Sequence, residues 1–568
     1  MKYKILAELY NEASSTTKRL EKIEILSKFL KKIKTKDIEI MYLLLGDIYP
    51  EYDERRIGIS NQLALKAIAK ATGTELKEVT KQWKKIGDIG KVAEILTKNK
   101  TQRTLQSKTL TTEKVLLNLR KLPELEGKGT VSKKLSLITE LLTSASPIEA
   151  LYLTRTLIGD LRIGIQESTI RESLAIAFFK KDKEISIKIQ EAIDRSNDLV
   201  AVFNLAQTGK LKELKKLQLQ VGKPIKAMLA QKVANIKEGF KALGTPCIIE
   251  YKYDGFRMII HKKGDKVILF TRSLENVTKQ FPEVVDYILK YVKGESFILD
   301  SEAVGFNKKT KKYTDFQEIS QRIRRKYNIK EIQNKLPVEV NVFDVLYYNG
   351  KSLLNEPFKK RTKLIKQIVK NHPYKIIRAK QIISSNEKKV KEFYKKSLKD
   401  NQEGIMMKNQ DAMYQPGRRV GHMMKIKPEV KDLDLVIVGA EHGKGKRSKW
   451  LSSFILACRG KKGEYLAIGK MGSGIKEKKE QGMSFEELTK KVTPYIISEK
   501  GLTVKIKPKI IISVTYQEIQ RSPNYPSGYA LRFPRFTALR NDKPLSEITS
   551  LEEIKDDLKH QKRNWKYG

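Results

Sequence analysis

A short stretch of the sequence, residues 250–257, joins a predicted strand to a tight turn and carries two cations. It reads Glu-Tyr-Lys-Tyr-Asp-Gly-Phe-Arg, so Lys252 stands at the strand end, beside a turn-forming Asp-Gly pair. A lysine becomes a nucleophile when a nearby cation or partial desolvation disfavours its ammonium form, and Arg257 is a candidate for that cation. The stretch indicates covalent catalysis by Lys252, although an ordinary charged hairpin explains this pattern, taken alone, equally well.

More charged or aromatic residues follow Lys252 at strand-like positions. Lys425 and Lys427 alternate with Ile426, so both ammonium groups are expected on one side of their strand, where they could face phosphoryl oxygens. In chain order the residues are Arg272, Asp300-Ser301-Glu302, Phe343-Asp344, Glu403 with Lys408, Arg419, Lys425-Ile426-Lys427, and Leu531-Arg532-Phe533-Pro534-Arg535-Phe536.

Three regions with different hydrophobic periods must position these residues. The first, 1–215, is predicted to be all-α: residues 26–33 form an amphipathic face, and a further helix should run from an N-cap at Ser60 to Gly73. Short β-rich segments alternate with lysine-rich helices over 216–428, which predicts an α+β domain. Strand follows strand over 429–568, which predicts a small β-barrel with a charged tail.

The composition indicates a polyanionic partner. Lys and Arg number 114 against 66 Asp and Glu, and the formal net charge is +48. A surface this basic gains affinity for nucleic acid by releasing counterions. Cys247 and Cys458 are the only cysteines and have no neighbours at metal-ligand spacing, so we expect neither disulfides nor zinc. With no signal peptide and no long apolar run, the sequence predicts a cytoplasmic, nucleoid-associated protein that does not enter membranes.

The ordered residues resemble the motif series of the covalent nucleotidyltransferases, which comprise DNA ligases, RNA ligases and mRNA capping enzymes. Residues 250–257 resemble the first motif, and Asp300-Ser301-Glu302 resembles the third, with Ser301 in place of the usual glycine. In the helical third, Gly159-Asp160-Leu161-Arg162-Ile163-Gly164 is similar to the DNA-binding domain of archaeal and eukaryotic replicative ligases. By resemblance the chain is identified as a member of the ATP-dependent DNA ligases, which implies nick sealing in replication, repair and recombination.

The resemblance also implies a fold and residue roles. The three domains would be an all-α DNA-binding domain, an adenylation domain and an oligonucleotide-binding (OB) barrel. Lys252 would attack the α-phosphate of ATP and carry AMP as a phosphoramidate. Glu250 would contact the adenine amino edge, and Phe343 would stack on the adenine face. Further nucleotide-binding residues are expected at Arg257, Arg272, Glu302, Arg419, Lys425, Lys427, Arg532 and Arg535.

Cofactor and partners follow from the same resemblance. Glu403 is expected to bind Mg²⁺, with Glu302 sharing that duty, because hard cations prefer oxygen ligands; Mn²⁺ remains an alternative. Arg532 and Arg535 would reach the β- and γ-phosphates when the barrel closes on the nucleotide. Nicked double-stranded DNA is the expected partner of a monomer. Gln102–Leu110 loosely resembles a clamp-binding peptide but lacks the aromatic pair of such peptides. Whether a sliding clamp is a second partner therefore stays an open question.

Four other classes of protein share part of this pattern. An mRNA capping enzyme uses the same lysine on GTP but normally lacks the helical third, and RNA ligases are usually shorter. An NAD-dependent DNA ligase needs a cysteine zinc finger and further modules beyond the barrel. A basic architectural DNA-binding protein explains the charge but not the ordered residues. Use of ADP, GTP or NAD⁺ as a secondary donor stays open.

Overall fold

The computed structural model describes residues 1–53, 55–99, 109–127, 129–179, 183–314, 316–323, 325, 327–417, 421–428, 432–443, 447, 449–477, 480 and 482–560. Two compact units make up the chain. One is formed by Met1–Leu76 with Ala93–Lys427, and the other by Lys77–Val92 with Pro428–Gly568. The predicted domain limits 1–215, 216–428 and 429–568 remain predictions. None of the helices in the described ranges has the length and apolar character that a membrane crossing requires.

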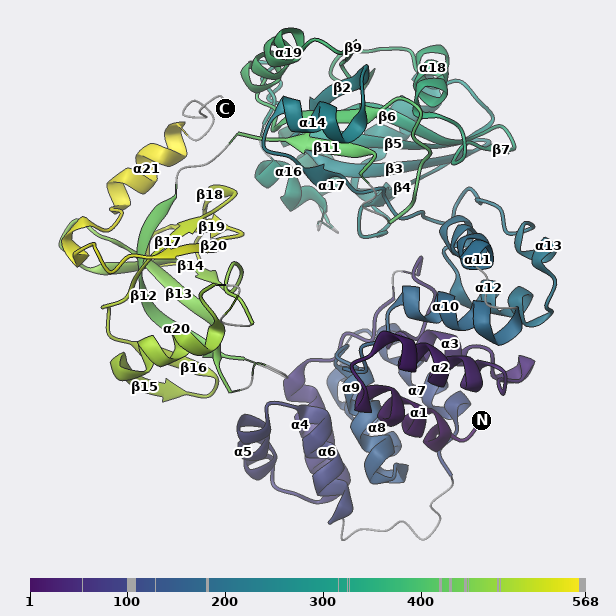
Figure 1. Cartoon of the computed structure of the whole chain (residues 1–568), viewed down its shortest axis with the longest axis vertical. Coiled ribbons are helices and arrows are strands. Elements are labelled where there is room, and N and C mark those ends of the chain that lie inside the picture. The colour runs from purple at the N-terminus through teal and green to yellow at the C-terminus, as the bar shows by residue number, and fades with distance from the viewer. Residues whose placement is uncertain are drawn as a thin grey trace. The chain divides into compact units, whose positions relative to one another are not determined.

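The first third of the chain is helical, as its periodicity predicts (Figure 1). The Ser60 side chain caps α4 by accepting a hydrogen bond from the Leu63 N–H, and Gly73 ends the helix in a left-handed conformation. The apolar face of residues 26–33 is buried, although α2 itself ends at Leu30. The helices are α1 (Tyr3–Ser15), α2 (Arg19–Leu30), α3 (Ile40–Leu43), α4 (Asn61–Thr72), α5 (Leu76–Ile86), α6 (Ile89–Lys98), α7 (Thr112–Glu124), α8 (Thr130–Ser144), α9 (Pro147–Leu157), α10 (Glu167–Phe178), α11 (Lys183–Ser196), α12 (Leu199–Gln207) and α13 (Leu211–Leu214).

Two sheets occupy the middle of the chain, and this confirms the predicted α+β region. One has the strand order β1-β11-β10-β2-β9, and the other has the order β4-β3-β5-β6-β7, with β8 paired to β6. Their strands are β1 (Gln231–Lys232), β2 (Cys247–Lys252), β3 (Phe256–Lys263), β4 (Lys266–Thr271), β5 (Ser296–Gly305), β6 (Val338–Tyr348), β7 (Lys351–Ser352), β8 (Ile376–Arg378), β9 (Gln381–Ser384), β10 (Gly404–Asn409) and β11 (Met423–Ile426). The accompanying helices are α14 (Ile236–Leu243), α15 (Pro282–Tyr291), α16 (Phe316–Ile323), α17 (Ile329–Lys335), α18 (Phe358–Ile368) and α19 (Glu387–Lys399).

The register of these strands brings distant parts of the sequence together. On β2, Lys252 pairs with Gly404 of β10, directly after Glu403. On β3, Arg257 pairs with Glu302 of β5. The strands β3, β4, β5 and β6 bury one large apolar cluster beneath α15 and α18. This cluster supports the strands that carry Arg257 and Glu302.

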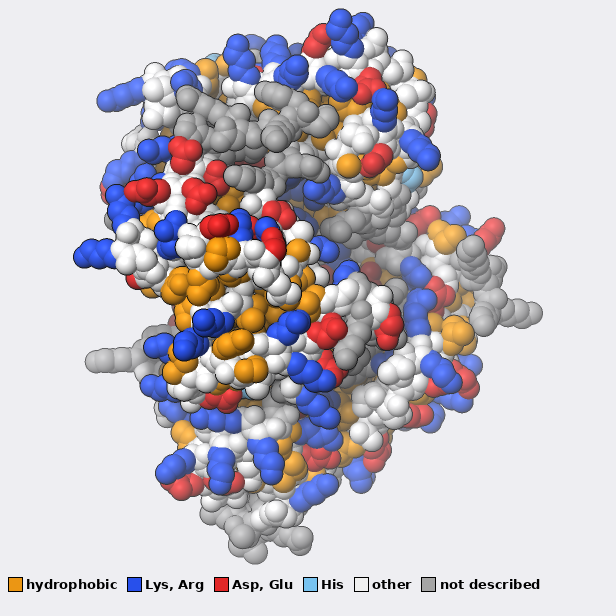
Figure 2. Space-filling view, turned by 60° about the vertical axis from the view of Figure 1, so that its left-hand side comes forward, with side chains coloured by type: hydrophobic (Ala, Val, Ile, Leu, Met, Phe, Trp, Pro, Cys, Tyr) orange, Lys and Arg blue, Asp and Glu red, His pale blue; other side chains and the backbone are white. Residues whose placement is uncertain are grey.

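The C-terminal unit is strand-rich, as predicted. Its central strand β12 pairs with β13, β16 and β17, and β17 pairs with β20. The strands are β12 (Leu433–His442), β13 (Leu451–Arg459), β14 (Tyr465–Met471), β15 (Ile496–Lys500), β16 (Thr503–Ile506), β17 (Ile511–Thr515), β18 (Glu518–Arg521), β19 (Tyr529–Arg532) and β20 (Arg535–Leu539). Two helices accompany them, α20 (Phe485–Val492) and α21 (Leu551–His560). Figure 2 shows Lys and Arg side chains dispersed over the visible face of the chain.

A buried ion pair ties α18 to β6. The Arg361 guanidinium donates to both carboxylate oxygens of Asp344, at 2.7 and 3.0 Å, and its side chain is 1% exposed. Another nitrogen of Arg361 donates to the Ala412 carbonyl at 3.1 Å. Arg361 thus fastens the segment after β10 to the sheet.

We expect Arg361→Ala to lower the free energy of unfolding by about 3–5 kcal/mol, because the variant leaves Asp344 buried without its cation. Thermal or denaturant unfolding measures the change. Lys360→Ala, on the same helix but with an exposed side chain, is the matched control and should change stability by less than about 0.5 kcal/mol. Equal losses in the two variants would show that Arg361 contributes no more than surface charge.

Candidate active site

Lys252, Glu403 and Lys427 form a compact charged cluster. The Lys252 ammonium lies 2.6 Å from the Glu403 carboxylate, and Lys427 contacts the same carboxylate oxygen. Backbone pairing holds the arrangement, since the Glu403 N–H donates to the Lys252 carbonyl at 2.9 Å. About one fifth of each side chain is exposed, so a ligand can reach the cluster. Two cations sharing one carboxylate leave a net positive centre at the end of β2.

The cluster shifts the pKa values of Glu403 and Lys427. Burial alone would raise the pKa of Glu403, but Lys252 and Lys427 outweigh it and lower this pKa to about 2. Burial lowers the pKa of Lys427, and the nearby Lys252 ammonium lowers it further, although Glu403 opposes both effects. Glu403 is thus a weak base that orients the ammonium groups.

Glu302 behaves in the opposite way. It lies on β5 opposite Arg257, and burial raises its pKa to about 8, against the attraction of Lys252 and Arg257. Repulsion from the Glu403 carboxylate adds to this shift, so the two carboxylates are close enough to sense each other. A divalent cation would relieve that repulsion, and the two oxygen donors suit Mg²⁺, which keeps most of its waters. The described residues contain no group of three or more metal-ligating His, Cys, Asp or Glu side chains.

Two glycines allow the backbone to close around these residues. A Cβ atom at Gly255 would lie 2.3 Å from the Ala303 carbonyl oxygen, and one at Gly404 would lie 2.2 Å from the Ile426 carbonyl oxygen. Both distances are shorter than any van der Waals contact. Glycine at these positions therefore lets the turn after Lys252 approach β5, and lets β10 approach β11.

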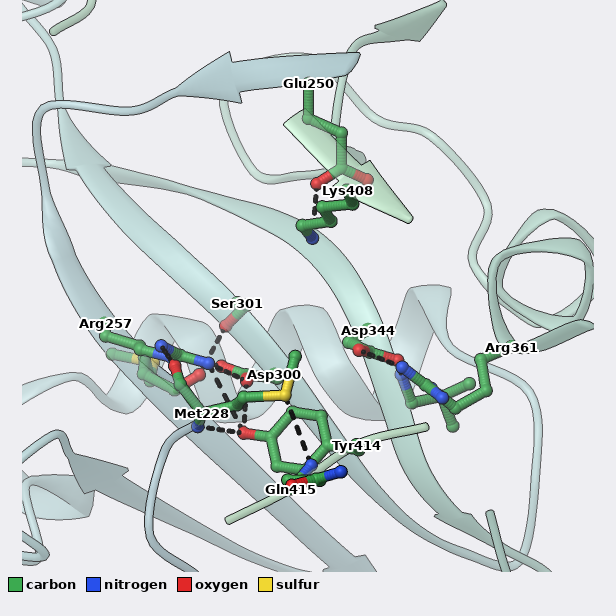
Figure 3. A network of polar contacts seen from close by, with 12 residues as sticks. Met228, Glu250, Arg257, Asp300, Ser301, Asp344, Arg361, Lys408, Tyr414 and Gln415 are labelled. Carbon is green, nitrogen blue, oxygen red and sulfur yellow. Dashed lines mark hydrogen bonds and ion pairs between the residues drawn. The ribbon is translucent and has the colours of Figure 1, made fainter. Parts of the chain in front are cut away.

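Arg257 belongs to a closed network of buried polar groups (Figure 3). Its guanidinium donates to both oxygens of Asp300 and, at 2.7 Å, to the Met228 carbonyl. The Tyr414 hydroxyl completes the ring, because it donates to Asp300 at 2.8 Å and accepts from the Met228 N–H at 3.0 Å. Ser301 is also buried and donates to the Met258 carbonyl, so it serves the strand pairing. The sequence prediction made Arg257 the cation beside Lys252; the structure shows Arg257 engaged by Asp300, and the cation that shares Glu403 with Lys252 is Lys427.

Glu250 and Lys408 form a second polar pair, on β2 and β10 (Figure 3). Glu250 is 2% exposed and pairs with Lys408 at 2.6 Å. Its other carboxylate oxygen is buried without a hydrogen-bond partner among the described residues. The Lys408 ammonium lies 4.7 Å from the centre of the Phe343 ring, and the Arg257 guanidinium lies 5.4 Å from it. An unpaired buried acceptor beside an aromatic ring suits a ligand with a flat face and a donor at its edge.

The remaining predicted site residues fall in different places. Lys425 lies on β11 opposite Met406, and Ile426 between the two lysines is buried, in agreement with the predicted alternation. Arg272 follows β4, is exposed, and has no ion pair among the described residues. Arg532 pairs with Glu518 in the C-terminal unit, where Arg535 is exposed at the start of β20. Arg419 and residues 102–108 of the clamp-peptide segment lie outside the described residues.

Sequence reasoning missed three residues that the structure brings to the site, namely Asp300, Lys408 and Tyr414. The first two stand inside recognised motifs, and an acid on a strand beside a required arginine is a signal that could have been read. Tyr414 lies in an irregular segment after β10, where neither periodicity nor a charge pattern marks it.

Comparisons with known proteins agree along the whole chain. A family profile described as ATP dependent DNA ligase domain matches residues 227–427. Profiles for the DNA ligase N terminus and the ATP dependent DNA ligase C terminal region match residues 2–175 and 447–543. The DNA ligase of Nanoarchaeum equitans is 41% identical over 565 residues, 99% of each chain, and that of Thermococcus onnurineus is 39% identical over 569 residues, again 99% of each.

A solved structure supports the fold. Pmar-Lig_PreS3 superposes with a TM-score of 0.59 at 17% identity, covering 94% of this chain and 99% of that one. With the profiles and relatives, these findings define a three-part nucleotidyltransferase. The chain belongs to the family of ATP-dependent DNA ligases, enzymes that use ATP and act on DNA.

We expect Tyr414→Phe to raise the KM for ATP in self-adenylylation more than it lowers kcat. The variant removes a hydroxyl that fixes Asp300, and through Asp300 the Arg257 guanidinium, and it leaves the Met228 N–H without its acceptor. Tyr347→Phe is the control, because Tyr347 packs against the apolar cluster that contains Tyr414, and its hydroxyl makes no hydrogen bond within the described part of the chain. An unchanged KM would separate Tyr414 from nucleotide binding.

The raised pKa of Glu302 predicts a pH-dependent stability. The carboxyl has an ordinary pKa of 4.5 and a pKa of about 8 in the folded chain, so the folded state binds the extra proton between these values. The stability that the folded chain gains from protonated Glu302 is thus lost as pH rises from 4.5 to 8. Glu302→Gln removes the titration, so the Tm difference between variant and parent should move in the variant's favour from pH 6 to pH 9. A difference in Tm that does not change with pH would contradict the raised pKa of Glu302.

Proposed function

We propose that this enzyme seals nicks in double-stranded DNA by carrying AMP on Lys252. The observation that carries the proposal is the Lys252 ammonium at the end of β2, held 2.6 Å from Glu403 with Lys427 on the same carboxylate. Lys252 would attack the α-phosphorus of ATP, a phosphoramidate bond would form, and the bond to the β-phosphate would break to release pyrophosphate. AMP would then pass to the 5′-phosphate of the nick, and the 3′-hydroxyl would displace it.

The neighbouring residues fit the needs of that first step. Lys252 attacks as the free amine, and Lys427, held on the same carboxylate oxygen, keeps a second cation beside the reacting phosphate. Glu403, with its lowered pKa, would hold the amine in line rather than remove its proton. Lys425 and Lys427 would face the phosphoryl oxygens, where fixed cations stabilise developing charge. Glu302 and Glu403 would hold Mg²⁺ or Mn²⁺, which supplies further charge to the phosphates when bound.

The nucleotide would be read by groups that already stand in place. The unpaired oxygen of Glu250 would accept from the adenine amino group, and Phe343 would stack on the ring. Arg257 would contact the ribose region from its ring of partners. Arg272, Arg419, Arg532 and Arg535 keep their proposed nucleotide contacts by resemblance. Action in replication, repair and recombination as a monomer, with a sliding clamp as a further partner, belongs to the same proposal.

Lys252→Ala should abolish the covalent adduct with α-labelled ATP while leaving DNA affinity unchanged within about twofold, because one lysine is a small part of the +48 charge. The adduct is measured as label on the protein that survives alkali and is released by acid, as a phosphoramidate P–N bond requires. Lys263→Ala, at an exposed position on β3, is the control and should keep the adduct. A labelled Lys252→Ala protein would overturn the choice of nucleophile.

A further inference from the structure

A second concave site lies beside β9 and α19, where the Tyr251 hydroxyl of β2 contacts Asp400. It is a cavity of about 370 Å³ lined by Lys311, Lys312, Tyr313, Tyr374, Lys380, Lys399, Asp400 and Asn401. These residues come from the loop after β5, the turn before β8, the start of β9 and the end of α19. None of them has a role in the proposed chemistry.

The charge of this lysine pocket is unbalanced. Four lysines face one carboxylate, and that carboxylate is already satisfied: Asp400 accepts from Lys380 at 2.9 Å and from the Tyr251 hydroxyl at 3.1 Å. Lys311, Lys312 and Lys399 have no ion-pair partner within the described chain. Some exposed lysines elsewhere have such a partner, for example Lys335 with Glu331 and Lys391 with Glu387. Three cations gathered in a concavity without an anion attract one from solution.

The walls of the pocket are held by a buried carboxylate. Glu339 is 1% exposed, and one of its oxygens accepts from the Tyr313 hydroxyl at 2.6 Å. Its other oxygen accepts from the Tyr374 backbone N–H, also at 2.6 Å. One acid beneath the surface therefore fixes two aromatic walls, and the Lys311 ammonium lies 4.7 Å from the centre of the Tyr374 ring. The pocket is built rather than an accident of side-chain packing.

Backbone conformation singles out the same place. Nine non-glycine residues in the described part of the chain have positive φ, and three of them line this pocket: Lys311 (56°), Tyr374 (62°) and Asn401 (58°). Asparagine adopts this region readily, but lysine and tyrosine do so at a cost of about 1–3 kcal/mol each. Such a cost persists at sites where the shape of the backbone serves a ligand.

We propose that the lysine pocket binds a phosphate of the DNA sugar–phosphate backbone next to the nick. The inference rests on the proposed function. The chain segments that carry Lys252 and Glu403 also carry residues next to the pocket, so they set the distance between the pocket and the reacting lysine. Tyr251, which contacts Asp400, precedes Lys252, and Gln402, which accepts from the Asp254 N–H at 2.9 Å, precedes Glu403. A duplex whose nick lies at Lys252 carries a regular series of further phosphates, since its strands carry one charge per ~1.7 Å of axis, and a lysine cluster beside the same sheet is a binding site for one of them.

The test compares two double variants with equal loss of charge. Lys312→Gln with Lys399→Gln removes two pocket cations. Lys309→Gln with Lys396→Gln removes two exposed lysines of the same loop and the same helix end that do not line the pocket. The Kd for a nicked duplex is measured against salt concentration in full-length protein, and self-adenylylation is measured in parallel.

For the pocket variant, the slope of log Kd against log salt should fall by about 1–2, at roughly one lost counterion release per phosphate contact. The matched variant should keep the parent slope, and both should keep the parent rate of self-adenylylation. Equal slopes in the two variants would overturn the proposal. Calorimetry with inorganic pyrophosphate tests the other source of phosphate. If only the pocket variant loses pyrophosphate binding and its salt slope for DNA is unchanged, the pocket binds a free phosphate and the proposal is wrong. Failure of the Lys252 adduct in the parent protein is a separate result, because the salt slope does not depend on adenylylation.

Discussion

The sharing of one carboxylate by two lysines is the interaction on which the site depends. Glu403 can hold Lys252 and Lys427 together only because β10 pairs with β2 in a register that sets Glu403 beside the end of β2. Without that carboxylate the two ammonium groups would repel each other, and without the second lysine the first would sit in an ordinary ion pair. Glu403 therefore fixes the position of both ammonium groups at the end of β2.

Buried charge elsewhere in the two-sheet region serves to position rather than to stabilise. Taking Arg257 and Asp300, or Arg361 and Asp344, out of water costs several kcal/mol per ion, and a well-packed apolar pair would give equal stability. The ion pairs instead fix the orientation of the Arg257 and Arg361 guanidinium groups. Arg257 is aimed by Asp300, Tyr414 and the Met228 carbonyl, while Arg361 and Tyr414 both hold the segment 412–414 that leads toward Arg419.

The sequence predicted local features better than contacts between distant segments. The caps of α4, the end of β2 at Lys252 and the alternation around Ile426 are decided within a few residues, where periodicity and turn chemistry act. Tyr414 could not be foreseen as a partner of Arg257, because it lies 157 positions away in a segment that no pattern marks. Asp300, 43 positions away, stands inside a recognised motif, but its contact with Arg257 depends on the strand pairing. The lysine pocket was missed for the same reason: its four segments have no common pattern until the fold brings them together. The roles of the predicted site residues remain proposals.

The unpaired oxygen of Glu250 has a consequence for the choice of base. A buried acceptor without a donor costs about 1–3 kcal/mol, and a ligand that supplies the donor recovers that cost on binding. With a purine edge placed there, an amino group at C6 satisfies the oxygen, whereas a carbonyl at C6 sets two acceptors against each other with no proton between them. Under the proposed placement of adenine, discrimination between ATP and GTP would rest less on the fit of the ring than on the cost of the unpaired Glu250 oxygen.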